Sequence, residues 1–561
     1  MVKLFGLSDL AGVLPSHLER YAERGSSEAH YLRKIIEAGA FHGQTPLDLL
    51  AIGTDIRKWG EIGMLPSLNS RRNPDRVAVI DEEGEMSFAE LDRSAHAVAN
   101  GLLAMGVRGG DGVAILARNH RWFLIAHYGA ARVGARIILL NSEFSGPQIK
   151  EVSAREGATV LIYDDEYSAA VSEATPSLGK LRALGVNPDS DTPSSSTDET
   201  LAQLIARSSS APAPNVTKYA SIIILTSGTT GTPKGANRST PPTLMPVGGI
   251  LSRVPFKAGE VTSLPSPMFH ALGFLQGTIA MFLGSTLVLR RRFKPQVVLD
   301  DLEKYKVASI VLVPVMLSRL LDAWEKLDTK PDLSSLKIVF ISGSQLGAEL
   351  ATRAMRDLGP VIYNMYGSTE IAFATIASPE DLQYNASTVG PVVKGVKVRL
   401  YDDNGQEVQR GEVGRIFVGN AFPFEGYTGG GNKQIIDGLM SSGDVGYFDE
   451  RGLLFISGRD DEMIVSGGEN VFPAEVEDLI SGLPAVVEAT AIGVDDKEWG
   501  QRLRAFVVVR PGETLDADTV KQYVRDNLAR YKVPREVVFL DELPRNPTGK
   551  VLKRELREMS L

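Results

Sequence analysis

The clearest chemical signal in the chain is a string rich in glycine and hydroxyl side chains, which follows an apolar run at 221–225. It reads Leu-Thr-Ser-Gly-Thr-Thr-Gly-Thr-Pro-Lys-Gly from Leu225 to Gly235. Backbone N–H groups in such a loop form an anion-binding nest, and Lys234 adds a positive charge, so phosphate is the expected ligand. The G-x-x-x-x-G-K-[ST] pattern of P-loop NTPases does not fit, because Pro233 precedes the lysine and Gly235 follows it.

Three later groups of residues could act on the same phosphates. Tyr-Gly-Ser-Thr-Glu at 366–370 offers an aromatic face for a purine and a carboxylate, which is a hard oxygen ligand for Mg²⁺. Asp444, with Arg459 fifteen residues later, could accept two hydrogen bonds from a cis-diol. Pro-Arg-Asn-Pro-Thr-Gly-Lys at 544–550 ends on Lys550, a cation that could stabilise negative charge developing at a phosphate.

In this order, the motifs resemble those of the adenylate-forming enzymes, which include acyl-CoA synthetases, peptide-synthetase adenylation domains and luciferases. The resemblance covers about 72–556 and points most closely to bacterial fatty-acid–CoA ligases. It implies ATP, Mg²⁺ and coenzyme A as ligands. It also implies two steps: a carboxylic acid and ATP give an acyl-adenylate and pyrophosphate, and the CoA thiol then releases AMP and the acyl-CoA.

The same resemblance implies a role for each matching residue. The expected catalytic residues are Lys550, Glu370, Thr229 and His270, with Glu370 also the ligand of Mg²⁺. Asp461 falls on the hinge about which the C-terminal domain turns between the two steps. The expected contacts with nucleotide or CoA are Thr226, Ser227, Gly228, Thr230, Gly231, Lys234, Gly343, Tyr366, Gly367, Thr369, Asp444, Arg459, Gly467 and Gly468.

A few positions depart from the family pattern without removing a charged group. Phe274 stands where some long-chain synthetases carry a tryptophan gate, four residues after His270. Ser442 replaces the usual threonine before Gly-Asp, and Gly343-Ser344-Gln345 replaces the frequent Gly-Ala-Pro. A tryptophan gate of the known form is therefore not expected.

Alternating helices and strands must position these residues. Ser87 and Glu90 have capping-box spacing before a helical pattern that Gly106 ends, and short apolar strands follow at 113–116, 137–140 and 160–163. Asn119 is expected to cap the next helix. The pattern predicts an α/β protein with a mainly parallel sheet in βαβ units.

The domains expected from this reading differ in size. Residues 1–70 form a helical extension without an assigned role, and residues 71–458 form a large ATP- and acyl-binding domain, in which dense glycines from 411 onward indicate a small β-rich subdomain. A hinge at 459–461 leads to a mobile α+β lid at 462–561 that carries the catalytic lysine.

Composition excludes several other classes of protein. The 561 residues include no cysteine, which excludes disulfides, thiolate zinc sites and a cysteine nucleophile. The net charge of −9 argues against a nucleic-acid partner. Residues 261–289 lack Asp, Glu, Lys and Arg, but prolines and glycines interrupt them, so we expect a buried helix and a strand rather than a transmembrane segment.

The apolar segment at 273–289 favours a medium- or long-chain fatty acid as the substrate. An aryl-acid CoA ligase and a fatty acyl-AMP ligase that loads a carrier protein stay open as alternatives. So does a catalytically dead ATP-binding regulator of the same fold, although pure binding would not need Lys550. We expect a cytoplasmic protein, with a peripheral membrane contact and a homodimer left open.

Overall fold

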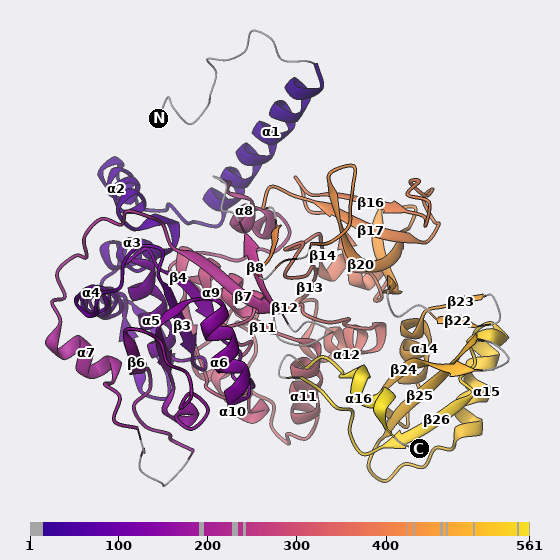
Figure 1. The fold of residues 1–561 in the computed structure, drawn as a ribbon. Coiled ribbons are helices and arrows are strands. Elements are labelled where there is room, and N and C mark those ends of the chain that lie inside the picture. Colours follow the sequence, from indigo (N-terminus) through magenta and orange to yellow (C-terminus); the bar gives the residue numbers. More distant parts are fainter. Residues whose placement is uncertain are drawn as a thin grey trace.

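The computed structural model describes residues 15–189, 194, 196–226, 234–238, 243–422, 424–428, 430, 432–460, 464–466, 469–496, 500–546 and 549–559. These residues form an α/β fold in which a small C-terminal domain lies beside a large N-terminal one (Figure 1). The predicted fold class is confirmed.

Two mainly parallel sheets form the body of the large domain. The first has the strand order β14 (Thr375–Ala377), β13 (Ile362–Tyr366), β12 (Ile338–Ile341), β11 (Ser309–Leu312), β9 (Val261–Ser263), β10 (Thr286–Val288), β1 (Val77–Asp81) and β2 (Gly84–Ser87). The second has the order β18 (Phe424–Tyr427), β8 (Lys234–Arg238), β7 (Ser221–Thr226), β4 (Arg136–Leu139), β3 (Gly112–Leu116), β5 (Ala158–Tyr163) and β6 (Gly179–Arg182). Only β2, β14, β8 and β18 pair antiparallel with their neighbours.

Helices of the large domain cover these sheets. They are α4 (Phe88–Met105), α5 (Arg121–Ala131), α6 (Gly146–Arg155), α7 (Leu201–Arg207), α8 (Met245–Leu251), α9 (Ala271–Phe282), α10 (Pro295–Lys304), α11 (Pro314–Glu325), α12 (Ala348–Leu358) and α13 (Pro379–Tyr384). The largest apolar cluster joins both sheets, since it contains Val79 and Leu287 of the first and Val113 and Ile137 of the second.

Two smaller sheets follow along the chain. An antiparallel sheet contains β15 (Gly390–Pro391), β21 (Leu453–Arg459), β20 (Leu439–Phe448), β17 (Gly414–Gly419), β16 (Lys397–Tyr401) and β19 (Ile435–Ile436). The C-terminal domain combines β22 (Ile464–Ser466), β23 (Glu469–Val471), β24 (Val486–Asp496), β25 (Gly500–Val509) and β26 (Glu536–Leu540) with α14 (Pro473–Ser481), α15 (Ala517–Asn527) and α16 (Lys553–Glu558).

Local sequence signals match most of these elements. The Ser87 hydroxyl accepts a bond from the Glu90 N–H, the Glu90 carboxylate accepts one from the Ser87 N–H, and Gly106 ends α4 at φ +107°. The uncharged stretch at 261–289 folds as β9, α9 and β10, as expected. No helix in the described part of the chain combines the length and apolarity needed to cross a bilayer.

The prediction for Asn119 is wrong. The residue before α5 is His120, and Asn119 does not cap the helix. Instead, the buried Asn119 amide donates to the carbonyls of Leu264 and Ser266, both at 2.9 Å, and accepts from the Met268 N–H. Its side chain thus ties the second sheet to the segment that leads into α9.

Three helices precede the first strand, namely α1 (Pro15–Glu37), α2 (Pro46–Gly63) and α3 (Leu65–Arg72). In Figure 1, α1 extends outward from the body, and its C-terminal part packs on α8 through Tyr31. The Glu28 carboxylate accepts a bond from the Leu244 N–H at the start of α8. At α2, the Trp59 indole donates to the Ala213 carbonyl at 3.1 Å. Packing therefore attaches this extension to the large domain.

Candidate active site

The carboxyl ends of two neighbouring parallel strands carry the first site residues. Tyr366 is the last residue of β13, and Gly343 follows β12. Ligands of open α/β sheets commonly bind at this edge. Gly367 makes the turn after Tyr366, where a Cβ atom would lie 2.1 Å from the Ala372 carbonyl oxygen. A glycine is required there because any side chain would collide with backbone.

Tyr366 and Arg459 meet on Asp444. The Tyr366 hydroxyl donates to Asp444 Oδ2 at 2.6 Å, and Arg459 Nη1 donates to Oδ1 at 3.2 Å. Asp444 and Arg459 face each other across β20 and β21, so the antiparallel register sets this pair. Residues 78 positions apart in sequence are thereby joined by a direct hydrogen bond.

Ser442 shapes the backbone under Asp444. Its hydroxyl accepts from the Asp444 N–H at 3.1 Å and donates to the Ile416 carbonyl on β17 at 3.1 Å. The serine therefore supplies the hydroxyl expected from the usual threonine. Burial raises the pKa of Asp444 above its ordinary value, against the opposing effects of Arg459, Tyr366 and Lys550.

Glu370 is held by donors on both oxygens. Tyr427, the last residue of β18, donates its hydroxyl to Oε1 at 2.6 Å, and the Ser368 hydroxyl donates to Oε2 at 2.9 Å. Burial alone would raise the pKa of Glu370, but these bonds and the charge of Lys433 outweigh it and hold the pKa below its ordinary value. The carboxylate is therefore ionised at neutral pH.

This donor set fits Mg²⁺ that arrives with phosphates. In the described residues no group of three or more His, Cys, Asp or Glu side chains could hold a metal by itself. Mg²⁺ is often bound by one or two carboxylates together with substrate phosphates, and an ionised, oriented Glu370 meets that requirement.

The phosphate-loop string is described only at its ends. Thr226 ends β7 and pairs with Lys234 at the start of β8. Lys234 Nζ lies 5.6 Å from the centre of the Tyr427 ring, which connects this strand pair to Glu370. The remaining predicted contacts of the loop, Ser227, Gly228, Thr229, Thr230 and Gly231, lie outside the described residues, as do Asp461, Gly467 and Gly468.

Lys550 follows Gly549, whose backbone packs closely against the large domain. Gly549 has φ +77°, and a Cβ atom added to it would lie 2.2 Å from Val315 Cγ1 at the start of α11. The Lys550 N–H donates to Asn546 Oδ1 at 2.9 Å, which holds the turn. The charge of Lys550 also acts on the Asp444 carboxylate. The C-terminal domain thus brings this lysine within electrostatic reach of Asp444.

His270 lies immediately before α9. Burial lowers the pKa of His270 to about 4, and its Nε2 atom has no hydrogen-bond partner in the described part of the protein. One turn later, the Phe274 ring meets His127 of α5 edge-on, at 5.3 Å between centres. His270 is therefore a neutral side chain beside an aromatic cluster.

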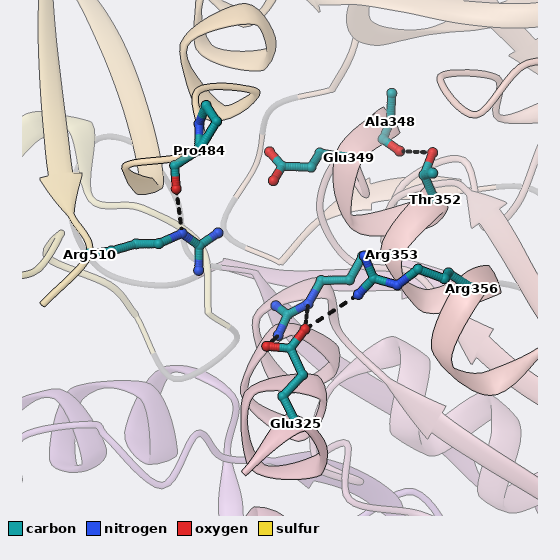
Figure 2. Close-up of a pocket in the computed structure, with 8 residues that line it drawn as sticks. All are labelled: Glu325, Ala348, Glu349, Thr352, Arg353, Arg356, Pro484 and Arg510. Carbon is teal, nitrogen blue, oxygen red and sulfur yellow. Dashed lines mark hydrogen bonds and ion pairs between the residues drawn. The ribbon is translucent and has the colours of Figure 1, made fainter. Parts of the chain in front are cut away.

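The two domains also meet at a cleft of about 580 Å³ between α12 and the C-terminal domain (Figure 2). On one side, Arg353 Nη2 pairs with Glu325 at 3.0 Å; on the other, Arg510 donates to the Pro484 carbonyl at 2.8 Å. Near this cleft, the Gln345 amide donates to Asp478 Oδ2 of α14 at 2.9 Å.

Two site residues were missed from sequence. Tyr427 and Lys433 carry no distinctive spacing, and each acts on Glu370 only after distant segments are brought together. Gln345 belongs to the segment Gly343-Ser344-Gln345 named from sequence, but its bond to Asp478 was not predicted. The only local signal was for Tyr427, an aromatic residue just before the glycine-rich run at 429–431.

Comparisons with known proteins agree with this geometry. Residues 68–428 match the AMP-binding enzyme family, and residues 475–550 match the AMP-binding enzyme C-terminal domain. An indoleacetate–CoA ligase from Aromatoleum aromaticum is 32% identical over 87% of this chain and 95% of its own length. A feruloyl-CoA synthase from Amycolatopsis is also 32% identical, over 88% of this chain and 98% of its own.

Among solved structures, the o-succinylbenzoate CoA synthetase of Bacillus subtilis in complex with its acyl-adenylate intermediate superposes with a TM-score of 0.75. It is 26% identical and covers 88% of this chain and 98% of its own. The chain belongs to the AMP-binding enzyme family, as an AMP-forming ligase that joins a carboxylic acid to CoA through an acyl-adenylate.

Proposed function

We propose that the acid is an aryl or arylalkanoic acid. The observation that carries this proposal is the aromatic cluster beside the start of α9, where His127 stacks on Phe123 at 6.4 Å and meets Phe274 edge-on. Burial lowers the pKa of His127 to about 3, so the cluster is uncharged at neutral pH. Aromatic walls favour aromatic ligands by offset or edge-to-face packing. The indoleacetate and ferulate in the relatives' names are consistent with this choice.

A medium- or long-chain fatty acid is the second candidate. It is favoured by α9 itself, which from Ala271 to Phe282 contains no charged side chain. An alkyl chain needs only apolar surface, whereas an aromatic ring also gains from the aromatic cluster.

In the proposed mechanism, the site residues divide the first step between them. Asp444 accepts hydrogen bonds from the ribose hydroxyls, and the Tyr366 ring stacks on adenine. Lys234 and the loop before it bind the outer phosphates. Glu370 would hold Mg²⁺, which would supply positive charge to neutralise the phosphates. Lys550 stabilises the charge that develops as the acid oxygen attacks the α-phosphorus and pyrophosphate leaves.

The second step needs the lid to turn. We propose that rotation at Asp461 withdraws Lys550 and brings Gly467 and Gly468 to the path of the CoA thiol. The sulfur then forms a bond to the acyl carbon as the bond to AMP breaks. One site would thus serve two reactions through a domain rotation.

The test is acid-dependent pyrophosphate release over pairs of acids with equal carbon counts, such as indoleacetate against decanoate and phenylacetate against octanoate. Each pair is measured with and without CoA. We expect the aryl member to give the higher kcat/KM. A consistent preference for the alkyl member would overturn the aryl proposal in favour of the fatty acid. No pyrophosphate release with any acid of either class would overturn both substrate proposals.

A further inference from the structure

The cation Lys433 faces the nucleotide site, although no motif assigns it a role. It lies in the segment between β18 and β19, and its Nζ atom is 3.5 Å from the point where a Cβ atom on Gly443 would stand. Arg459 Nη2 is 3.2 Å from the same point. Two positive charges therefore lie side by side next to Asp444.

The two cations differ in their ion-pair partners. In the described part of the chain, no carboxylate pairs with Lys433 Nζ, whereas the neighbouring Arg459 is paired with Asp444 at 3.2 Å. Like charges at short range repel, and the repulsion grows where protein displaces water. An anion between the two cations would remove it.

Lys433 and Lys550 act electrostatically on different carboxylates of the site. The charge of Lys433 lowers the pKa of Glu370, whereas that of Lys550 acts on Asp444. Glu370 is the carboxylate proposed for Mg²⁺ and Asp444 the one proposed for ribose. Lys433 Nζ thus lies beside Gly443, next to the proposed ribose contact, and its charge also reaches Glu370 at the proposed metal end.

The charge balance supports the same ligand. The described cations around this site are Lys234, Lys433, Arg459 and Lys550, and the described carboxylates are Glu370 and Asp444. A surplus of positive charge is suited to Mg²⁺-bound triphosphate, which stays anionic, more than to the singly charged phosphodiester of an acyl-adenylate.

We propose that Lys433 binds the β- and γ-phosphates of ATP, and the pyrophosphate that leaves, as a further positioning cation of the adenylation step. This inference rests on the proposed placement of ATP along Asp444 and Glu370. It adds a residue that acts on the triphosphate alone and therefore before the acyl-adenylate exists.

The test measures binding of Mg²⁺-ATP and of AMP by calorimetry, which requires no knowledge of the acid. Lys433→Ala should weaken ATP binding about 10- to 50-fold, the usual loss for a charge-assisted contact, and leave AMP binding within twofold. Lys433→Arg should recover most of the affinity for ATP. The matched control is Lys397→Ala. Lys397 is an exposed lysine on β16, in the sheet that also contains β20 and β21, and its loss should change the affinity for neither nucleotide.

Two results would overturn the inference. Equal losses for ATP and AMP in Lys433→Ala would place the lysine at the ribose or α-phosphate. Unchanged affinity for both, with the melting temperature of wild type, would show that it contacts no phosphate. A wild-type protein that binds neither nucleotide would instead refute the proposed placement of ATP, so the two failures are distinguishable.

Discussion

The carboxylates of the nucleotide site accept more hydrogen bonds than those of the domain interface. In the site, both oxygens of Glu370 and both of Asp444 accept hydrogen bonds. At the interface, Asp478 accepts one bond, from Gln345, and no bond or ion pair involves the Glu349 side chain in the described part of the cleft. Burial raises the pKa of Glu349, although Arg510 and Arg353 lie near enough to oppose the effect (Figure 2).

This difference follows from what each region has to do. In the proposed mechanism, the residues that bind AMP belong to the large domain and would keep their partners through both steps. Contacts across the interface would break when the lid turns, and tightly paired groups there would slow the turn. The single bond to Asp478 and the unpaired Glu349 in the described part of the cleft are compatible with the proposed domain movement.

The largest expected effect is that of Lys550→Ala. Removing a cation from the charge that develops in the transition state should lower acid-dependent pyrophosphate release about 100- to 1000-fold. Thioester formation from a preformed acyl-adenylate and CoA should stay within twofold, because the proposed mechanism uses Lys550 in the first step only. Both half-reactions are measured separately by pyrophosphate and thioester assays.

A matched control is Lys553→Ala, three residues further along. Lys553 pairs with Glu477 inside the C-terminal domain at 2.9 Å, so its loss tests lid stability without removing the catalytic charge. Equal loss of both half-reactions in Lys550→Ala would contradict the division of labour between the steps.

Asp444→Asn is expected to act within the large domain and so in both steps. It removes the charge that orients Arg459 and would accept the ribose hydroxyls, and we expect the KM for ATP and that for the acyl-adenylate to rise about 10- to 100-fold each. Steady-state kinetics of the two half-reactions are the measurement. A loss confined to the first step would show that Asp444 does not hold the AMP portion.

Sequence patterns singled out several residues that meet within the large domain, but they did not predict the contact between the domains. Tyr366, Glu370, Asp444 and Arg459 sit at strand ends and in turns, where type and spacing indicate chemistry. The Gln345–Asp478 contact depends on how two domains dock, which no local pattern encodes. Asn119 shows the same limit, since a good capping residue instead bonds to a segment 145 residues away.

Gly549→Ala tests how the C-terminal domain docks on the large domain, and we expect it to lower pyrophosphate release about tenfold. The added methyl group would meet Val315 Cγ1 at 2.2 Å, and a β-branched side chain at a helix start has little freedom to move aside. Pyrophosphate release should fall while thioester formation from acyl-adenylate is kept. Gly512→Ala is the control, because Gly512 has a similar φ of +87° in the same domain with open space around it. Equal effects of the two substitutions would indicate backbone strain rather than impaired docking of the C-terminal domain.

The smallest expected effect is a pH dependence carried by Asp478. Burial and the neighbouring Glu477 raise the pKa of Asp478 to about 7, against the bond from Gln345, while the lid is docked; a fully solvated aspartate titrates near 3.8. A raised pKa means that the docked state binds the proton more tightly. Protonation therefore favours docking, and this contribution is lost as pH rises through about 7.

Because Asp478 is exposed to solvent, which screens its interactions, we expect the ratio of adenylation to thioester formation to fall no more than about threefold between pH 6 and 8. Asp478→Asn keeps an acceptor for Gln345 but cannot ionise, so it should flatten this part of the profile. Glu475→Gln, on the same helix, serves as the control because Glu475 pairs with Lys532 inside the lid. A profile unchanged by Asp478→Asn would mean that the interface carboxylates do not bias docking. The sparse pairing there would then ease separation of the domains without coupling it to protons.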